Sequence, residues 1–264
     1  MNLTDLRDYA ENEIKDADAT VSLLVHDFTS NETVLSFEPE RKLVAASIIK
    51  TAIMLTALDL VQKGKLSLDQ RIPVSCQEVL EDTEVFNCGQ KDCPLEELIT
   101  WMIINSDNTA TNILIELLGI DTINGYCESL GLKSTVLERK MLDWDAVKAG
   151  RNNYTSAADQ LAVFSKLYHK SILSPELCEL ALSVLKRQRD FSSGLRYLCS
   201  SDITFAHKTG GLDHLNHDAG IFYLTGHEYY FGCYVTEAMS DTEENPVAKR
   251  LIGRLSKAVY EFYK

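Results

Sequence analysis

The chain has 264 residues, of which 45% are hydrophobic and 25% are charged, a composition typical of a soluble globular protein with one or two closely packed domains. The formal net charge of −13 at pH 7 argues against nucleic acid or an anionic membrane surface as a partner, because both would repel the chain. No apolar run is long enough to span a membrane, and residues 1–6 lack the basic and apolar segments of a secretory signal. We therefore expect a cytoplasmic protein or the trimmed form of a secreted one.

The seven cysteines are spread along the chain, at positions 76, 88, 93, 127, 178, 199 and 233. An odd, scattered set is typical of reduced thiols in a cytosol. Zinc bound by the first three is the alternative, but their spacing differs from that of the usual zinc knuckle and no histidine is nearby in the sequence. The sequence therefore predicts reduced thiols, no metal and no cofactor.

The first part of the chain predicts a helix followed by a hairpin. Residues 3–17 carry apolar side chains at helical spacing, and two β-rich runs at 21–28 and 33–37 flank a short polar turn. From residue 46 to about 193 the pattern is mostly helical. Two stretches within that block are expected to be loops: residues 76–94 and 142–153.

Strand character returns toward the end of the chain, in residues 203–208, 219–224 and 229–236, before a last helix over about 246–263. This order does not repeat a strand-helix-strand unit. It predicts one antiparallel sheet of about five strands, built from both ends of the chain, with a helical block inserted.

The fold class that follows is α/β (α+β). We expect a discontinuous sheet domain of residues 1–40 and 195–264 and an all-helical domain of residues 41–194, with the active site at their interface.

Ser47 opens an apolar helical segment, residues 47–63, which stops at Gly64. Lys50 lies three residues on, so it projects from the same face and can reach the Ser47 oxygen. A serine beside an amine that can take its proton is an activated nucleophile. A second Ser-x-x-Lys, from Ser183 to Lys186, lies inside another predicted helix, and we interpret it as an ordinary helix face.

Two further polar motifs could complete a site. Ser106-Asp107-Asn108 lies between two apolar helical segments and could place a hydroxyl and an amide in a cleft; the alternative is a helix N-cap. Lys208-Thr209-Gly210-Gly211 ends a predicted strand and offers a positive charge, a hydroxyl and an accessible backbone; the alternative is a polar strand end with a glycine turn.

Ser47-x-x-Lys50, Ser106-Asp107-Asn108 and Lys208-Thr209-Gly210 occur in this order, on a helix start, an inter-helix loop and an edge strand. In these motifs and in their spacing the sequence resembles the penicillin-recognising serine hydrolases, most closely the class A β-lactamase superfamily, over essentially the whole chain. The resemblance implies a β-lactamase/transpeptidase-like fold and hydrolysis of β-lactam amides. We expect a monomer whose substrate is a small molecule, a β-lactam or an acyl-peptide carrying a carboxylate.

The resemblance implies catalytic roles that the residue types support. Ser47 would attack the amide carbonyl and become acylated, and Lys50 would act as base or proton relay. Ser106 would pass a proton toward the leaving nitrogen. The backbone N–H groups of Ser47 and Gly211 would form the oxyanion hole.

Substrate binding is implied for the remaining motif residues. Asn108 would bind the side-chain amide of the substrate, and Lys208 with Thr209 would bind its carboxylate. Gly210 and Gly211 would let the substrate approach the backbone of the strand.

The match to class A enzymes breaks in the loop between the second and third motifs, where those enzymes carry a glutamate that activates the deacylating water. Alignment on Arg139 puts Met141 at that place. Asp143 could take over the role or could simply hold the loop, and the Arg–Asp clamp of the family would here pair Arg139 with Asn153. Without a general base, which contributes roughly 10²–10⁴-fold, the acyl-enzyme would hydrolyse slowly.

A second departure follows the third motif, where the strand lacks the arginine that many class A enzymes use to hold the carboxylate. Asp218 would repel an anion if it faced the cleft. The run Asp213-His214-x-x-His217-Asp218 contains four metal-ligand types, but a turn between strands also collects such residues, and we expect no metal there. His207 is interpreted as a strand residue and not as a base.

Two alternatives to β-lactam hydrolysis stay open. One keeps the nucleophile and changes the substrate to a D-alanyl peptide or small ester, which the cytoplasmic-looking N-terminus favours. The other is a penicillin-binding sensor module that deacylates slowly, which the missing glutamate favours.

Overall fold

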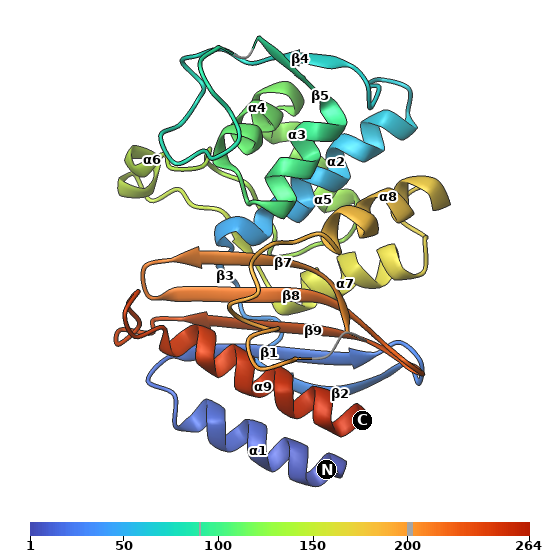
Figure 1. Ribbon diagram of the computed structural model, residues 1–264, viewed down its shortest axis with the longest axis vertical. Helices are drawn as coiled ribbons and strands as arrows, with labels where there is room; N and C mark the ends of the chain where they lie inside the picture. Colours follow the sequence, from blue (N-terminus) through green and yellow to red (C-terminus); the bar gives the residue numbers. More distant parts are fainter. Residues whose placement is uncertain (90, 200–202) are drawn as a thin grey trace.

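Five strands form one antiparallel sheet in the order β2-β1-β9-β8-β7 (Figure 1). This computed structural model describes residues 1–89, 91–199 and 203–264. The strands of the sheet are β1 (Thr20–Asp27), β2 (Glu32–Phe37), β7 (Thr204–Leu212), β8 (Leu215–Leu224) and β9 (His227–Thr236). The first two come from the start of the chain and the last three from its end, so the predicted five-stranded sheet is confirmed.

Helices cover both faces of the sheet (Figure 1). One face packs against α1 (Leu3–Lys15) and α9 (Val247–Tyr263). The other faces the helical block, which contains α2 (Lys50–Gln62), α3 (Leu95–Ile104), α4 (Asn108–Leu118), α5 (Ile120–Ser129), α6 (Trp144–Lys148), α7 (Ala157–Tyr168) and α8 (Pro175–Leu185).

The strands supply one core from each face because successive side chains along a strand point to opposite sides. Phe222 and Phe231 are fully buried toward α1 and α9, whereas their neighbours Ile221 and Tyr230 are fully buried toward the helical block. The sheet is therefore sandwiched between two hydrophobic layers.

The helix that follows Ser47 lies in the middle of the helical block. A short 3-10 helix, η1 (Ala46–Ile49), leads directly into α2. All residues of α2 from 50 to 59 are buried, as expected for a helix that is hydrophobic on all sides. The predicted helix over residues 47–63 is confirmed, and it anchors the motif at its start in the core.

Two short strand pairs were not predicted from the sequence. β3 (Leu43–Val44) pairs with β6 (Tyr154–Thr155), and β4 (Arg71–Pro73) pairs with β5 (Asp92–Pro94). The first pair ties the segment before Ser47 to the end of the 139–153 loop.

The edge strand β7 and its neighbour β8 are longer than predicted. Lys208-Thr209-Gly210-Gly211 was expected to end its strand, but all four residues lie within β7, and the turn occurs at Asp213 and His214. His214 adopts the turn with a positive φ of 58°. His217 and Asp218, expected in the turn, are buried strand residues of β8.

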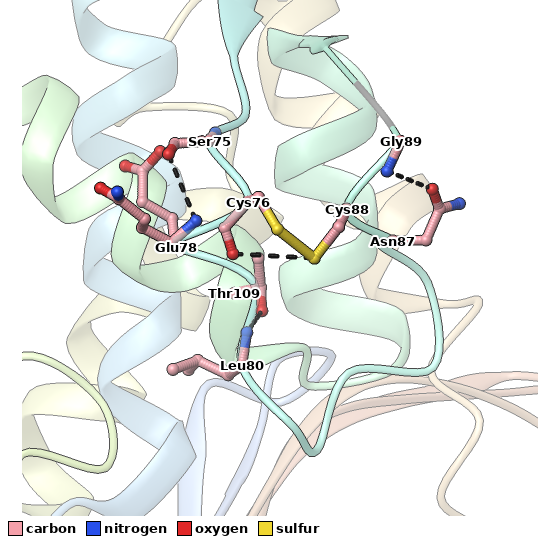
Figure 2. The surroundings of a disulfide bond; sticks show 9 residues. Ser75, Cys76, Glu78, Leu80, Asn87, Cys88, Gly89 and Thr109 are labelled. Atoms are coloured by element: carbon pink, nitrogen blue, oxygen red, sulfur yellow. Dashed lines mark hydrogen bonds between the residues drawn. A yellow bond between two sulfur atoms is a disulfide. The ribbon is translucent and has the colours of Figure 1, made fainter.

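Cys76 and Cys88 form a disulfide, so the prediction of seven reduced thiols is wrong for these two residues (Figure 2). The same bond excludes them as zinc ligands. The other five cysteines are free thiols: Cys93, Cys127, Cys178, Cys199 and Cys233. The spacing of the cysteines in the sequence could not predict this disulfide. The path of the intervening loop decides whether the two sulfur atoms come together.

Over residues 1–89, 91–199 and 203–264, no group of three or more His, Cys, Asp or Glu side chains is arranged to hold a metal ion. In the same residues, none of the helices combines the length and apolar composition that crossing a bilayer requires.

Candidate active site

Ser47 lies on η1, where the edge strand β7 packs against the start of the buried helix. A Cβ on Gly210 would lie 3.2 Å from Ala45 O and 3.2 Å from Ile48 Cγ1. The absence of a side chain at this position therefore lets β7 approach η1 closely. This contact brings the first and third motifs together.

Lys50 lies at the start of α2, and its side chain is fully buried. Its Nζ is 2.6 Å from Ser106 O, 2.8 Å from Asn108 Oδ1 and 3.1 Å from Ser106 Oγ. A neutral amine has two hydrogens for the two carbonyl oxygens, and its lone pair can accept the hydroxyl hydrogen of Ser106. The three contacts therefore suit a neutral Lys50 that exchanges a proton with Ser106.

Lys208 approaches Ser106 from β7. Its Nζ is 3.0 Å from Ser106 Oγ and donates to Thr209 O at 2.7 Å. The hydroxyl of Ser106 thus lies between two lysine nitrogens, one from the helical block and one from the sheet.

Burial is the main reason why both amines lose protons more readily than usual. It lowers the pKa of Lys50 well below the ordinary value, and Lys208 lowers it further, while Asp107 and Asp82 oppose the fall. Burial also lowers the pKa of Lys208 to about 7, against two nearby aspartates that raise it. One of the two amines can therefore be neutral near pH 7 while the other retains much of its charge.

The second motif combines a helix cap with two site residues. Asp107 is the N-cap of α4 and accepts from Ala110 N at 2.7 Å, so the capping alternative is correct for this residue. Ser106 and Asn108, on either side, instead contact Lys50. Ser106 has a φ of 55°, which is a left-handed conformation. This conformation is unfavourable in free energy for any residue other than glycine.

A cavity of about 80 Å³ opens beside Ser47. The residues around it belong to the three motifs, lie next to a motif, or come from the 139–153 loop: Ala46, Ser47, Asn108, Arg139, Met141, Leu142, Trp144, Asn153, Gly211 and Leu212. Four of them also line a larger cavity of about 760 Å³, which includes the cations Arg139, Arg196 and Lys249. The nucleophile candidate therefore lies beside a space large enough for a small-molecule substrate.

The family model described as the beta-lactamase enzyme family matches residues 5–263. The chain belongs to the beta-lactamase enzyme family. The extended-spectrum beta-lactamase PER-1 of Pseudomonas aeruginosa is 25% identical over 273 residues, which cover 97% of this chain and 87% of that protein. A beta-lactamase of Bacteroides uniformis is 24% identical over 277 residues, covering 98% of this chain and 91% of that protein.

Solved structures show the same fold in other proteins. The beta-lactamase from Chitinophaga pinensis has a TM-score of 0.88 at 22% identity, covering 98% of this chain and 100% of that one. PBP-A has a TM-score of 0.87 at 26% identity, covering 100% of this chain and 97% of that one. A mutant of PBP-A, in an acyl-enzyme complex with penicillin-G, has a TM-score of 0.87 at 25% identity, with coverage of 100% and 97%.

This member of the beta-lactamase enzyme family closes its 139–153 loop differently from the expected clamp. The guanidinium of Arg139 donates from Nε to Asn152 Oδ1 at 3.0 Å and from Nη1 to Lys140 O at 3.1 Å. Asn153 Oδ1 instead accepts hydrogen bonds from the backbone N–H groups of Glu138 and Arg139, at 2.8 and 3.1 Å. The prediction that the Arg139 guanidinium contacts Asn153 is wrong, because the side-chain oxygen of Asn153 accepts from backbone N–H groups.

Of the two roles that the sequence left open for Asp143, activating water or holding the loop, the contacts of its side chain fit the second. Its Oδ1 accepts from Ala146 N at 2.9 Å and caps α6, a helix that lies inside the predicted loop. Asp143 is exposed and does not line the cavity beside Ser47. Met141 and Leu142 line that cavity, so its wall is apolar at these two residues.

Asp218 does not face the cleft. It is fully buried on the α9 side of the sheet, 2.7 Å from His207 Nδ1, and it accepts from Gly194 N at 2.8 Å. The expected repulsion of a substrate anion is therefore absent, and His207 is the strand residue that the sequence predicted.

The segment closed by the disulfide contributes to the site in a way that the motifs in the sequence do not predict. Asn108 Nδ2 donates to Asp82 Oδ2 at 2.6 Å, and Thr83 Oγ1 donates to Asp107 Oδ2 at 2.5 Å. The available signal was the pair Cys76 and Cys88, whose bond would have placed the intervening residues in one closed loop.

Proposed function

We propose that this protein is a serine hydrolase that opens β-lactam amides through an acyl-Ser47 intermediate. The observation that carries the proposal is the meeting of two buried lysines, Lys50 and Lys208, at the hydroxyl of Ser106, beside the cavity that Ser47 lines. Membership of the beta-lactamase enzyme family and the similarity to PER-1 support the choice of substrate class.

In this mechanism Ser47 Oγ attacks the lactam carbonyl while its proton passes to the neutral amine of Lys50. The N–H groups of Ser47 and Gly211 receive the developing oxyanion, where one such donor is commonly worth about 3 kcal/mol. The C–N bond then breaks, and the leaving nitrogen takes the hydroxyl proton of Ser106. Ser106 regains a proton from the lysine amines around it.

The carboxylate of the substrate binds at Lys208 and Thr209. Lys208 carries the charge of the third motif, and the larger cavity adds Arg139, Arg196 and Lys249 to its surroundings. Asp213, Asp241 and Glu243 line the same cavity and offset these cations, so the local attraction for an anionic substrate, on a chain whose net charge is −13, depends on Lys208.

The test is incubation with a chromogenic cephalosporin followed by intact-mass measurement. We expect an acyl adduct or turnover with the wild-type protein and neither with Ser47→Ala. Ser183→Ala is the matched control, because this exposed serine belongs to the other Ser-x-x-Lys and donates to Leu180 O on its own helix. Equal loss in both variants would contradict the choice of nucleophile, and esterase activity without an adduct would favour the peptidase/esterase alternative.

A second candidate function, penicillin binding with slow deacylation, is favoured by the apolar wall of Met141 and Leu142. No carboxylate lines the cavity beside Ser47 within the described parts of the chain. The similarity to PBP-A, whose mutant forms an acyl-enzyme complex with penicillin-G, supports the same candidate.

Met141→Glu tests this candidate by adding a carboxylate to the cavity wall. We expect deacylation to become at least about tenfold faster, because general base catalysis contributes roughly 10²–10⁴-fold. The measurement is the decay of the acyl adduct by mass spectrometry. Asp143→Asn is the control and should leave the rate unchanged, since Asp143 caps α6; a slower rate in that variant would return Asp143 to the mechanism.

A further inference from the structure

The disulfide closes a loop, residues 76–88, that is fixed against the second motif. Leu80 N donates to Thr109 Oγ1 at 2.9 Å (Figure 2), and Thr83 Oγ1 donates to Asp107 Oδ2 at 2.5 Å. Phe86 of the same loop is buried in the core of the helical block. The loop therefore has a defined position beside the active site.

Asp82 is placed by this loop at the amide of Asn108. Its Oδ2 accepts from Asn108 Nδ2 at 2.6 Å, while Asn108 Oδ1 is 2.8 Å from Lys50 Nζ. Because a carboxylate accepts and an amine donates, these two contacts fix which end of the amide is nitrogen. The amide nitrogen has a second hydrogen, which can bind a substrate carbonyl while the first stays on Asp82.

The carboxylate of Asp82 carries a charge that the protein itself does not neutralise by a direct ion pair. No cationic side chain pairs with Asp82 in the parts of the chain that the structure describes. Asp82 is exposed, so water solvates it in the free protein and a ligand can reach it. A positive group on a substrate bound at Asn108 would meet this charge.

We propose that Asp82 binds an ammonium group on the acyl side chain of the substrate and makes the protein prefer β-lactams with a free α-amine. This inference rests on the proposed function. The α-carbon follows directly after the carbonyl of the amide that Asn108 would bind, so an amine on it lies next to the Asn108–Asp82 pair. Loop closure by the disulfide limits the freedom of the carboxylate before binding, which favours such a contact.

Ampicillin and benzylpenicillin test the inference, because they differ by one α-amino group. The second-order rate of acylation would be measured by intact mass at pH 6, where the α-amine is protonated. We expect the wild-type protein to acylate faster with ampicillin, and Asp82→Asn to lower the ampicillin-to-benzylpenicillin ratio about fivefold, the size of an exposed ion pair. The ratio of the wild type should also fall at high salt.

Glu84→Gln is the matched control, since Glu84 is an exposed carboxylate of the same loop and the substitution removes the same charge. We expect it to keep the wild-type ratio. A ratio unchanged by Asp82→Asn, with both compounds still acylating Ser47, would overturn this inference and leave the proposed function standing. A wild-type protein that neither compound acylates would overturn the proposed function and the inference with it.

Discussion

Two buried lysines share one hydroxyl, and their charges cannot both be retained at low cost. Lys50 and Lys208 are fully buried, and each lies within 3.1 Å of Ser106 Oγ. Desolvation disfavours both ammonium groups, and a charged Lys208 further disfavours protonation of Lys50. The resulting arrangement gives the site one amine suited to taking a proton and one suited to attracting an anion.

The lowered pKa of Lys208 predicts how acylation depends on pH. Below about 7 Lys208 is protonated and attracts a substrate carboxylate, and above that value it becomes neutral and loses the attraction. We expect the second-order acylation rate for benzylpenicillin to fall as the pH rises through about 7. The measurement is stopped-flow or mass-detected acylation across the pH range, with a neutral ester as control; an equal fall for the ester would assign the effect to another group.

The residues of the three motifs were predictable from the sequence because each motif is a short run with a fixed spacing. The roles of Arg139 and Asp143 were not, because they depend on which of several neighbours each side chain meets. Asn152 and Asn153 are adjacent in the sequence, and only the course of the loop decides that the guanidinium meets the first and the backbone meets the second. Asp143 has no motif partner, and its N-cap role appears only once α6 forms in a stretch expected to be a loop.

The loop of residues 76–88 acts as a structural element although it contains neither helix nor strand. Its contacts with Asp107, Asn108 and Thr109 touch three successive residues at the start of α4. The second motif is therefore supported from outside by a segment distant from the sheet. Such support lowers the freedom of side chains that must be in place before a substrate arrives.

We expect removal of the disulfide to lower the stability of the protein. Cys76→Ser combined with Cys88→Ser should lower the free energy of unfolding by about 2–3 kcal/mol, the value for closing a loop of this length. The measurement is urea denaturation followed by circular dichroism. Cys199→Ser is the control, because Cys199 is an exposed free thiol and its substitution should leave the midpoint unchanged; an unchanged midpoint in the double variant would mean that the bond does not stabilise the fold.

The layered arrangement of the whole molecule was predictable because long periodic segments dominate it. The two-residue and three-residue strands β3, β4, β5 and β6 were not, since such short runs carry no periodicity. The lengths of β7 and β8 were underestimated because glycine, aspartate and histidine disfavour strands locally. Packing outweighs this local preference here. Gly210 allows β7 to contact η1 closely, and Asp218 contacts His207 between the sheet and α9.

The pairing of β1 with β9 has a consequence for how the chain reaches this structure. Leu23 lies opposite Cys233, so the central ladder joins positions separated by most of the polypeptide. During synthesis the N-terminal hairpin emerges early and must wait, with one long edge unpaired, until the last strands leave the ribosome. Contacts so distant in sequence slow the search for the native topology, so this protein is expected to fold late and to depend on protection of that edge while it is being made.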